Sequence, residues 1–493
     1  MAYPSKDGLR VLLINGLLGG DFSSLDIGLT VLATWLNKKT RHQGLIADLT
    51  FHSRDWRQHL HREIDRKKPD IIALSCNTMY MKYIRQILPE IRTRHKQPII
   101  LGGHHATAHP EDTFAIPEAN AVCIGDGEEV ISAYADRIQD GGSFAGVPGL
   151  WARSDREGEV RNDSAGFVSD LNQLGALDWD LWDDLDRYFY FLGMLYVQGQ
   201  RGCPYRCTFC DVVAYSDSMR AAGKQYFRLR DPRDFAAELE EYYGRYAQRG
   251  MRLFQIFDPV FTMKDSWVET FCDEYRRLGL EKKIRYSVFS RIDHLSEEKV
   301  RLLARSGCAL LRVGIESGDD RVRMQVYGKK ISTDTVRRIF NVAKEGGLDF
   351  TAFYILGGPT ETRQTFKKTI DLAWELDAAR SAFFLFKPFA EPARAQVLES
   401  GGWVDERRWD EAETITWGAT TGGSDWGPKT AERYQWAAYG LTMGRRWVRM
   451  LQRRKLAYFP DLAEYFTRGL VAGLDWRYLA MYFHIYEGDN VDR

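Results

Sequence analysis

The sequence lacks the features that mark membrane, nucleic-acid-binding and exported proteins. No apolar run reaches the ~18 residues that a membrane-spanning helix needs. Lys plus Arg and Asp plus Glu both number 68, so no excess of positive charge favours a nucleic-acid surface. The opening residues, MAYPSKDGLRVLLINGLLGG, lack the layout of a signal peptide. We therefore expect a cytoplasmic protein with no membrane and no nucleic-acid partner.

Cysteine is scarce and odd in number, with seven among 493 residues. In a chain of this size without an export signal, we expect reduced thiols and no disulfide framework. Internal repeats and low-complexity tracts are also absent from the sequence. The hydrophobic content of 44% and the charged content of 28% are ordinary for a globular protein. The length exceeds what one hydrophobic core supports and predicts roughly two to four domains.

Residues 1–140 alternate strand and helix patterns. Apolar runs such as RVLLIN, PDIIALSC and QPIILGG have the pattern of buried parallel strands, and helical patterns separate them. This alternation predicts an α/β fold with an N-terminal doubly wound, Rossmann-like parallel sheet, whose ligand site lies at the carboxyl ends of the strands. Residues 141–190 are irregular and rich in Gly, Asp and Trp. We expect this segment to be a linker.

Residues 191–395 resume the alternation with six further strand patterns, MLYVQGQ, LFQIFD, IRYSVFSR, LLRVGIES, FTAFYILGG and SAFFLFKP. Six βα units predict a partial, open (β/α)6 barrel with its active site at the C-terminal strand ends. After this span the alternation stops. Residues 396–493 have helical patterns and many Trp residues, and we expect them to form a helical C-terminal domain.

Three of the seven cysteines lie within eight residues, in the segment GQRGCPYRCTFCDV that follows the first barrel strand. Cys203, Cys207 and Cys210 are spaced C-x3-C-x2-C. A closed zinc site takes four protein ligands, and no second CxxC or His pair stands nearby to complete one. A disulfide would leave one thiol over and does not suit a reducing compartment. The spacing favours a 4Fe–4S cluster with one open iron over zinc or a structural use.

The cysteine motif, with Phe209 before its last cysteine, resembles that of the radical S-adenosylmethionine (SAM) superfamily. In that superfamily the open iron binds SAM, and the reduced cluster cleaves SAM to a 5′-deoxyadenosyl radical that abstracts hydrogen from the substrate. The resemblance implies a 4Fe–4S cluster and SAM as cofactors. It also implies an electron donor, which is a flavodoxin-type or a chemical reductant.

Four later segments at predicted strand ends resemble the SAM-contacting segments of the same superfamily. They read IFDPVF, SRID, GIESGDD and YILGGPTET, in the order and spacing that the superfamily has. The resemblance implies SAM contacts by Asp258, Arg291, Glu316, Ser317, Gly357 and Gly358.

The N-terminal segments SCNTMY, PIILGGHHATAHPEDTF and ANAVCIGDGEE resemble the cobalamin-binding-type domain that precedes many radical SAM enzymes. The Asp-x-His-x-x-Gly motif of other cobalamin proteins is missing, as it is in many relatives, so bound cobalamin is left open. His104, His105 and His109 lack a completing carboxylate or Cys pattern, which favours solvated histidines over a metal site. The cysteines outside the motif sit in apolar contexts and are expected to be buried; these are Cys76, Cys123, Cys272 and Cys308.

Four side chains are candidates for substrate contact or proton handling at the barrel mouth: Tyr286, Tyr354, Lys387 and Glu391. The acidic, Trp-rich stretch after them suits a polar, cationic, sugar-like substrate. We favour the plainer interpretation that this acidic, Trp-rich stretch caps the open barrel.

Three functions remain open at this point. The first is a radical SAM enzyme of antibiotic biosynthesis, loosely resembling the aminoglycoside diol dehydratases, that dehydrates an aminoglycoside-like substrate for a downstream reductase partner. The alternative is a cobalamin-dependent radical SAM methyltransferase. The third is a non-enzymatic iron–sulfur carrier, which would need no such barrel pocket.

Overall fold

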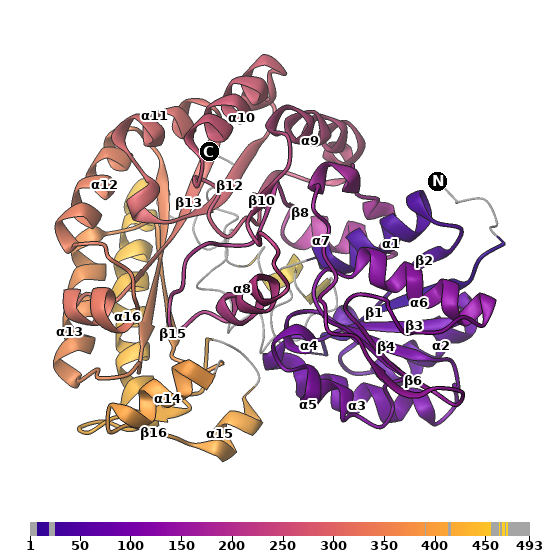
Figure 1. Ribbon diagram of the computed structural model, residues 1–493. Coiled ribbons are helices and arrows are strands. Elements are labelled where there is room, and N and C mark those ends of the chain that lie inside the picture. The colour runs from indigo at the N-terminus through magenta and orange to yellow at the C-terminus, as the bar shows by residue number, and fades with distance from the viewer. Residues whose placement is uncertain are drawn as a thin grey trace. The chain divides into compact units, whose positions relative to one another are not determined.

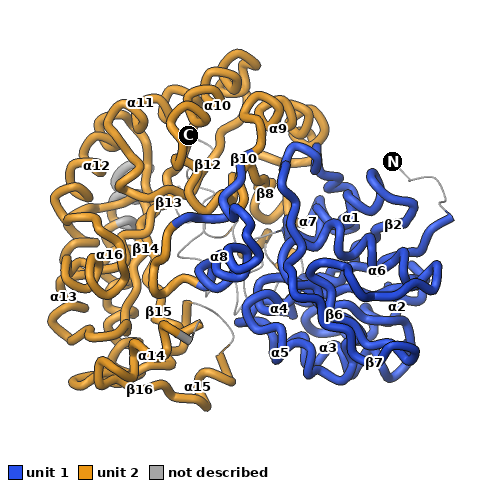
Figure 2. The backbone as a smooth tube through the Cα atoms, in the orientation of Figure 1, with its two compact units in different colours: residues 1–187, 202–204, 211–229 blue, residues 188–201, 205–210, 230–493 orange. Residues whose placement is uncertain are grey.

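A computed structural model describes residues 7–18, 25–389, 391–412 and 416–454, and after these residues 463, 466–468, 470 and 471. Its chain divides into two compact units, which Figure 2 shows in blue and orange. Unit 1 comprises residues 1–187, 202–204 and 211–229. Unit 2 comprises residues 188–201, 205–210 and 230–493.

Unit 1 is built on a seven-stranded sheet in the order β2-β1-β3-β4-β5-β6-β7. Figure 1 labels β1, β2, β3, β4 and β6 of this sheet. Its strands are β1 (Arg10–Asn15), β2 (Gln43–Asp48), β3 (Ile71–Ser75), β4 (Ile99–Gly102), β5 (Ala121–Cys123), β6 (Leu150–Ser154) and β7 (Gly158–Arg161). The first five pair in parallel, which confirms the doubly wound sheet. The strand order reverses between β1 and β3, and ligands of such sheets bind at that reversal, beyond the carboxyl ends of the strands.

Residues 141–190, expected to be a linker, contain two further strands of this sheet. β6 pairs antiparallel with β5, and β7 pairs antiparallel with β6. Arg153 on β6 holds the hairpin down by donating to the carbonyls of Phe114, Ile116 and Ala119. The composition of this segment did not predict the hairpin, because its strands are short and turn residues surround them.

Helices connect and cover the strands of unit 1. They are α1 (Ile27–Lys39), α2 (Trp56–Lys67), α3 (Met81–Arg92), α4 (His104–Ala108), α5 (Pro110–Phe114), α6 (Glu128–Asp140) and α8 (Val212–Ala221), with α7 (Leu185–Phe191) leading into unit 2. α1 lies so close to β2 that Asn37 exchanges two hydrogen bonds with the backbone of Gly44.

Unit 2 contains the expected barrel strands as one parallel six-stranded sheet in the order β15-β14-β13-β12-β11-β8, which confirms the partial barrel. These strands are β8 (Met194–Val197), β11 (Leu253–Ile256), β12 (Arg285–Ser290), β13 (Cys308–Glu316), β14 (Asp349–Leu356) and β15 (Arg380–Leu385). The helices are α9 (Pro232–Tyr246), α10 (Asp265–Arg277), α11 (Glu297–Arg305), α12 (Thr333–Glu345) and α13 (Arg363–Leu376). The sequential order of the strands places all their carboxyl ends at one edge of the sheet.

The described part of residues 396–454 belongs to unit 2 and is mainly helical, as expected. It contains α15 (Glu406–Glu411) and the long α16 (Pro428–Arg454), preceded by α14 (Glu391–Glu399), and a small hairpin of β16 (Trp403–Val404) and β17 (Thr421–Gly422). Tyr439 of α16 exchanges hydrogen bonds with the backbone of Phe383 on β15. Among the described residues, no helix has the length and apolar character to cross a membrane.

Replacing Gly44 by Ala should destabilise unit 1. A Cβ there would lie 2.5 Å from Cα and 2.6 Å from the carbonyl oxygen of Ala33 on α1, so helix and strand must separate. We expect a loss of about 1–3 kcal/mol in the free energy of unfolding, measured by urea denaturation. The control is Gly440→Ala in α16, where a Cβ would meet nothing within 4 Å. This substitution should raise the free energy of unfolding by about 0.5–1 kcal/mol. A Gly44→Ala protein as stable as wild type would refute this packing.

Candidate active site

The three-cysteine loop leaves the sheet of unit 2 just after β8 and the short strand β9 (Gln200–Arg201). Cys207 is buried, whereas Cys203 and Cys210 are partly exposed. The backbone N–H of Cys210 donates to the carbonyl of Cys207 at 3.1 Å, which closes the C-x2-C end as a tight turn. The loop thus begins where a barrel active site is expected, at a carboxyl strand end.

A π-helical turn, Val322–Val326, anchors the middle of this loop. Thr208 donates its hydroxyl to the carbonyl of Val326 at 2.7 Å and its N–H to the carbonyl of Tyr327 at 3.4 Å. The Phe209 ring meets the Tyr327 ring edge-on, with centroids 5.3 Å apart. π-helical turns are rare and often occur at functional sites. Here the turn holds the two residues between Cys207 and Cys210.

Arg291 follows β12 and lies beside the loop. Its Nη1 donates to the Cys207 sulfur at 3.3 Å. Its guanidinium also pairs with Asp293 and lies 3.7 Å from the centroid of the Tyr205 ring. The structure therefore brings a predicted SAM contact, Arg291, directly onto a predicted cluster ligand.

Asp258 follows β11 and is fully buried. Its Oδ1 accepts hydrogen bonds from the backbone N–H groups of Gly199 at 2.8 Å and Gln200 at 2.9 Å. Burial raises the pKa of this carboxyl to about 7, while the two N–H donors act against that rise. Its Oδ2 is buried and has no partner within the described residues. The observed contacts brace the chain leading into the cysteine loop, and a SAM contact through Oδ2 stays a prediction.

Glu316 is the last residue of β13 and has an unusual backbone conformation, and Ser317 follows it. Glu316 has φ +67°, a left-handed value that costs a residue other than Gly about 1–3 kcal/mol and tends to occur at functional sites. Its buried carboxylate pairs with Lys329 at 2.6 Å. A Cβ at Gly314 would lie 2.0 Å from that carboxylate, so a larger residue there would displace the ion pair. The Ser317 hydroxyl accepts from the N–H of Asp319.

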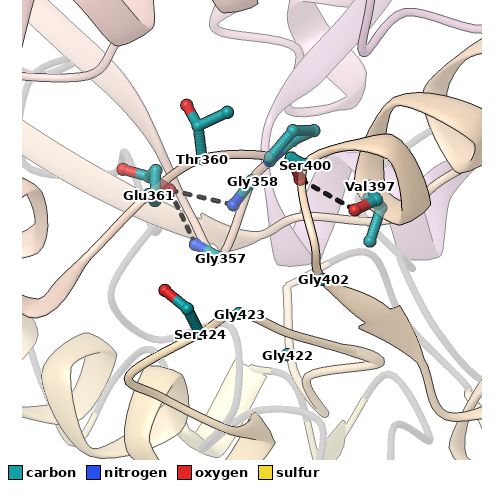
Figure 3. A pocket seen from close by; sticks show the side chains of 11 residues that line it. Gly357, Gly358, Thr360, Glu361, Val397, Ser400, Gly402, Gly422, Gly423 and Ser424 are labelled. Atoms are coloured by element: carbon teal, nitrogen blue, oxygen red, sulfur yellow. Dashed lines mark hydrogen bonds between the residues drawn. The ribbon is translucent and has the colours of Figure 1, made fainter.

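The Gly357–Gly358 loop after β14 borders a hollow of about 210 Å³ that also touches Ser400, Gly402 and residues 422–424 (Figure 3). Glu361, which the sequence interpretation missed, accepts the N–H groups of both glycines at 2.9 Å. Burial raises the pKa of Glu361 to about 8. A Cβ at Gly358 would lie 2.0 Å from the Tyr327 hydroxyl, so this loop closes tightly on the residue that anchors Phe209.

These residues fit the cofactors that the sequence motifs imply. Three cysteines can bind three of the four irons of a 4Fe–4S cluster. The positive charge of Arg291 would stabilise a thiolate at Cys207. Among the described residues, no three Cys, His, Asp or Glu side chains converge as a single metal ion requires. A cluster binds one thiolate per iron and therefore needs more widely spaced sulfurs than one ion does.

The two tyrosines predicted at the barrel mouth are both packed inside unit 2. Tyr286 lies near the amino end of β12, and its hydroxyl bonds to Ser306 at 2.6 Å. Tyr354 is fully buried in β14 and stacks on Phe383 with centroids 5.0 Å apart. Burial raises the pKa of both phenols well above the usual value. These contacts are structural, and Tyr286 lies at the end of its strand opposite to the mouth.

Lys387 is only 3% exposed, and its ammonium binds the carbonyls of Trp417 and Gly418. Burial lowers the pKa of Lys387 to about 8. These contacts tie the segment before α16 to the end of β15. Glu391 begins α14, and its side chain lies outside the described residues. Substrate contact by either residue remains a prediction.

The carboxyl strand ends of unit 1 offer hydrogen-bonding side chains. Ser75 ends β3 and Thr78 follows it, both partly exposed, and His104 follows β4 and is exposed. This donor set fits the amide groups of a corrin. His105 is buried instead of solvated, because it bonds to Thr78 at 3.1 Å and Asp112 at 2.9 Å. Residues 19–24, between β1 and α1, lie outside the described residues.

Sequence reasoning missed Asp126, which follows β5. Its buried carboxylate accepts from Arg228 at 2.5 Å and from the N–H of Val168 at 2.9 Å, which fastens the segment beyond α8 to the sheet of unit 1. The four cysteines outside the motif are all buried, as expected. Burial raises the thiol pKa of each, to about 11 at Cys272 and about 12 at Cys308.

Comparison with protein families finds two domain matches in the chain. Residues 197–373 match the radical SAM superfamily, and residues 19–135 match the B12 binding domain. The chain thus combines a B12-binding domain with a radical SAM domain, which confirms both resemblances. The radical SAM domain implies the 4Fe–4S cluster and SAM, and the B12-binding domain supports cobalamin as a further cofactor.

Three proteins illustrate what this chain is similar to. An uncharacterized methyltransferase of Pyrococcus horikoshii is 27% identical over 375 residues, 74% of this chain and 76% of that protein. The anaerobic magnesium-protoporphyrin IX monomethyl ester cyclase of Cereibacter sphaeroides is 22% identical over 67% of this chain and 53% of its own length. The radical SAM methyltransferase TsrM of Kitasatospora setae, solved with cobalamin and a [4Fe-4S] cluster, superposes with a TM-score of 0.66 at 22% identity over 79% of this chain and 78% of its own.

A triple variant with Cys203, Cys207 and Cys210 replaced by Ala should lose its iron and sulfide after anaerobic reconstitution, because the cluster has no other thiolates nearby. Iron and acid-labile sulfide assays measure the loss. The control is Cys308→Ala, which removes a buried thiol outside the motif and should keep a full load. Full loading of the triple variant would contradict the cluster assignment.

Glu361 should make unit 2 less stable as the pH rises. The pKa of Glu361 is about 8 in the folded protein, above its value in the unfolded chain. The contribution of this carboxyl to the free energy of unfolding is therefore fully present below about pH 4.5 and is lost progressively as the pH rises to about 8. Urea unfolding between pH 5 and 8 should show wild type losing stability relative to Glu361→Gln. The control, Glu375→Gln, removes an exposed carboxylate whose pKa Arg337 lowers, and it should leave the slope unchanged in this range. Parallel curves for wild type and Glu361→Gln would refute the raised pKa.

Proposed function

We propose that this chain, with its B12-binding domain ahead of a radical SAM domain, is a cobalamin-dependent radical SAM methyltransferase that acts on a small polar molecule. The joining of these two domains in one chain carries the proposal, because cobalamin can supply methyl transfer beside the cluster. The methyltransferase names of the Pyrococcus relative and of TsrM support it.

The chain's own residues would bind and position the reactants. Cys203, Cys207 and Cys210 would hold the cluster, and the Gly357–Gly358 loop, which borders a hollow, would contact SAM. When bound, the cluster supplies electrons to SAM and cobalamin supplies methyl transfer. The buried pair of Glu316 and Lys329 would hold the end of β13 rigid beside these groups.

Methyl transfer replaces the aminoglycoside dehydration that we first expected. The relatives favour it, and a downstream reductase partner is then not required. In the acidic, Trp-rich stretch, Trp426 is buried and donates its Nε1–H to the carbonyl of Glu361, whereas Trp403 is exposed. That contact supports a capping role for the stretch. We therefore propose a small, polar substrate and do not specify a sugar. We propose a flavodoxin-type protein as the electron donor.

The proposal can be tested with SAM carrying a deuterated methyl group. Reconstituted protein with hydroxocobalamin, a flavodoxin system and a polar metabolite extract should produce S-adenosylhomocysteine and a product heavier by one labelled methyl group. Mass spectrometry measures both products. Without hydroxocobalamin, labelled product should fall at least tenfold. Formation of 5′-deoxyadenosine with a dehydrated product and no labelled methyl group would overturn methyl transfer in favour of dehydration.

A further inference from the structure

We infer that Arg291 sets the reduction potential of the cluster through its contact with Cys207. This role is distinct from the SAM contact that the sequence motif implies. The inference rests on the cluster, which the radical SAM domain implies, and it does not depend on methyl transfer.

The contact is short, buried and fixed in direction. Nη1 of Arg291 lies 3.3 Å from the Cys207 sulfur, and the residue is only 5% exposed. The opposite edge of the guanidinium binds Asp293 through Nε at 3.0 Å and Nη2 at 2.8 Å. This bidentate pairing leaves Nη1 free of the carboxylate and directs it at the sulfur.

The face of the guanidinium is also held. The Arg291 Cζ lies 3.7 Å from the centroid of the Tyr205 ring, and the Tyr205 hydroxyl binds the His294 ring. Tyr205 stands two residues before Cys207 in the loop, and His294 stands three residues after Arg291. The loop and the segment after β12 are therefore joined at two points, the ring and the sulfur.

A buried cation at a ligand sulfur favours the reduced cluster. Reduction adds one negative charge to a group that already carries thiolate charge, and hydrogen bonds to the sulfurs raise its potential. Burial keeps water and salt from screening the interaction. Removing the cation should therefore move the potential to a more negative value. For a one-electron couple, each 59 mV of shift changes the reduced-to-oxidised ratio tenfold at a given applied potential.

A role limited to SAM binding gives a different expectation. An Arg291 that serves only the SAM carboxylate would change SAM affinity when replaced, and it would leave the potential of the SAM-free cluster unchanged. The two roles are separated by measuring the cluster before SAM is added.

The experiment is a redox titration, monitored by electron paramagnetic resonance, of the full reconstituted chain without SAM and without corrin. The midpoint potential of Arg291→Gln should be more negative than that of wild type. The difference should be at least the shift that changes the reduced-to-oxidised ratio of the cluster tenfold. Arg291→Lys keeps the charge without the planar fork and should fall between the two. The matched control is Arg285→Gln, which loses the same charge at the first residue of β12, where Arg285 binds the carbonyls of Gly307 and Cys308.

Iron and sulfide assays normalise the signal, and a SAM titration follows on each protein. Equal shifts in Arg291→Gln and Arg285→Gln would overturn the proposal, because the effect would then be one of net charge. An unshifted Arg291→Gln would also overturn it, and weakened SAM binding in that variant would assign the residue to SAM alone. Failure of both Arg291 variants to load a cluster would replace the proposal with a purely structural role.

Discussion

The anchoring of the cysteine loop to the strand ends of unit 2 is the constraint on which the other features of the site depend. A loop with three thiols is of use only if its backbone is fixed before the cluster arrives. Asp258 holds its entrance, the carbonyls of Val326 and Tyr327 hold Thr208, and Arg291 holds Cys207. Each anchor comes from a different strand end, so the barrel order itself determines where the loop lies.

The same anchors connect the loop to the segment that borders the hollow after β14. Tyr327 touches Phe209 with its ring edge, and its hydroxyl leaves room only for Gly at position 358. Glu361 in turn binds the two glycine N–H groups. The strained backbone of Glu316 lies at the end of the neighbouring strand β13. Close packing therefore links the predicted cluster ligands to the predicted SAM contacts without long flexible segments.

The sequence predicted those parts of the molecule that depend on local pattern. Continuous apolar runs identified the parallel strands of both sheets, and the cysteine spacing identified the cluster loop. The β6–β7 hairpin escaped because its strands are short, and the contact of Arg291 with Cys207 escaped because 84 residues separate the two. The order of strands alone cannot show which side chain reaches which loop. Tyr286 lies near the amino end of β12, the end opposite to the expected site, which its position in the strand pattern could have shown.

The central claim is that one chain holds both a cluster and a corrin. The measurement that tests it most directly is anaerobic reconstitution with iron, sulfide and hydroxocobalamin, followed by desalting and by determination of bound iron and of the bound-corrin spectrum. We expect about four irons and near one equivalent of corrin per chain. A full cluster with no retained corrin would contradict the central claim, and the B12-binding domain would then be a scaffold that has lost its cofactor.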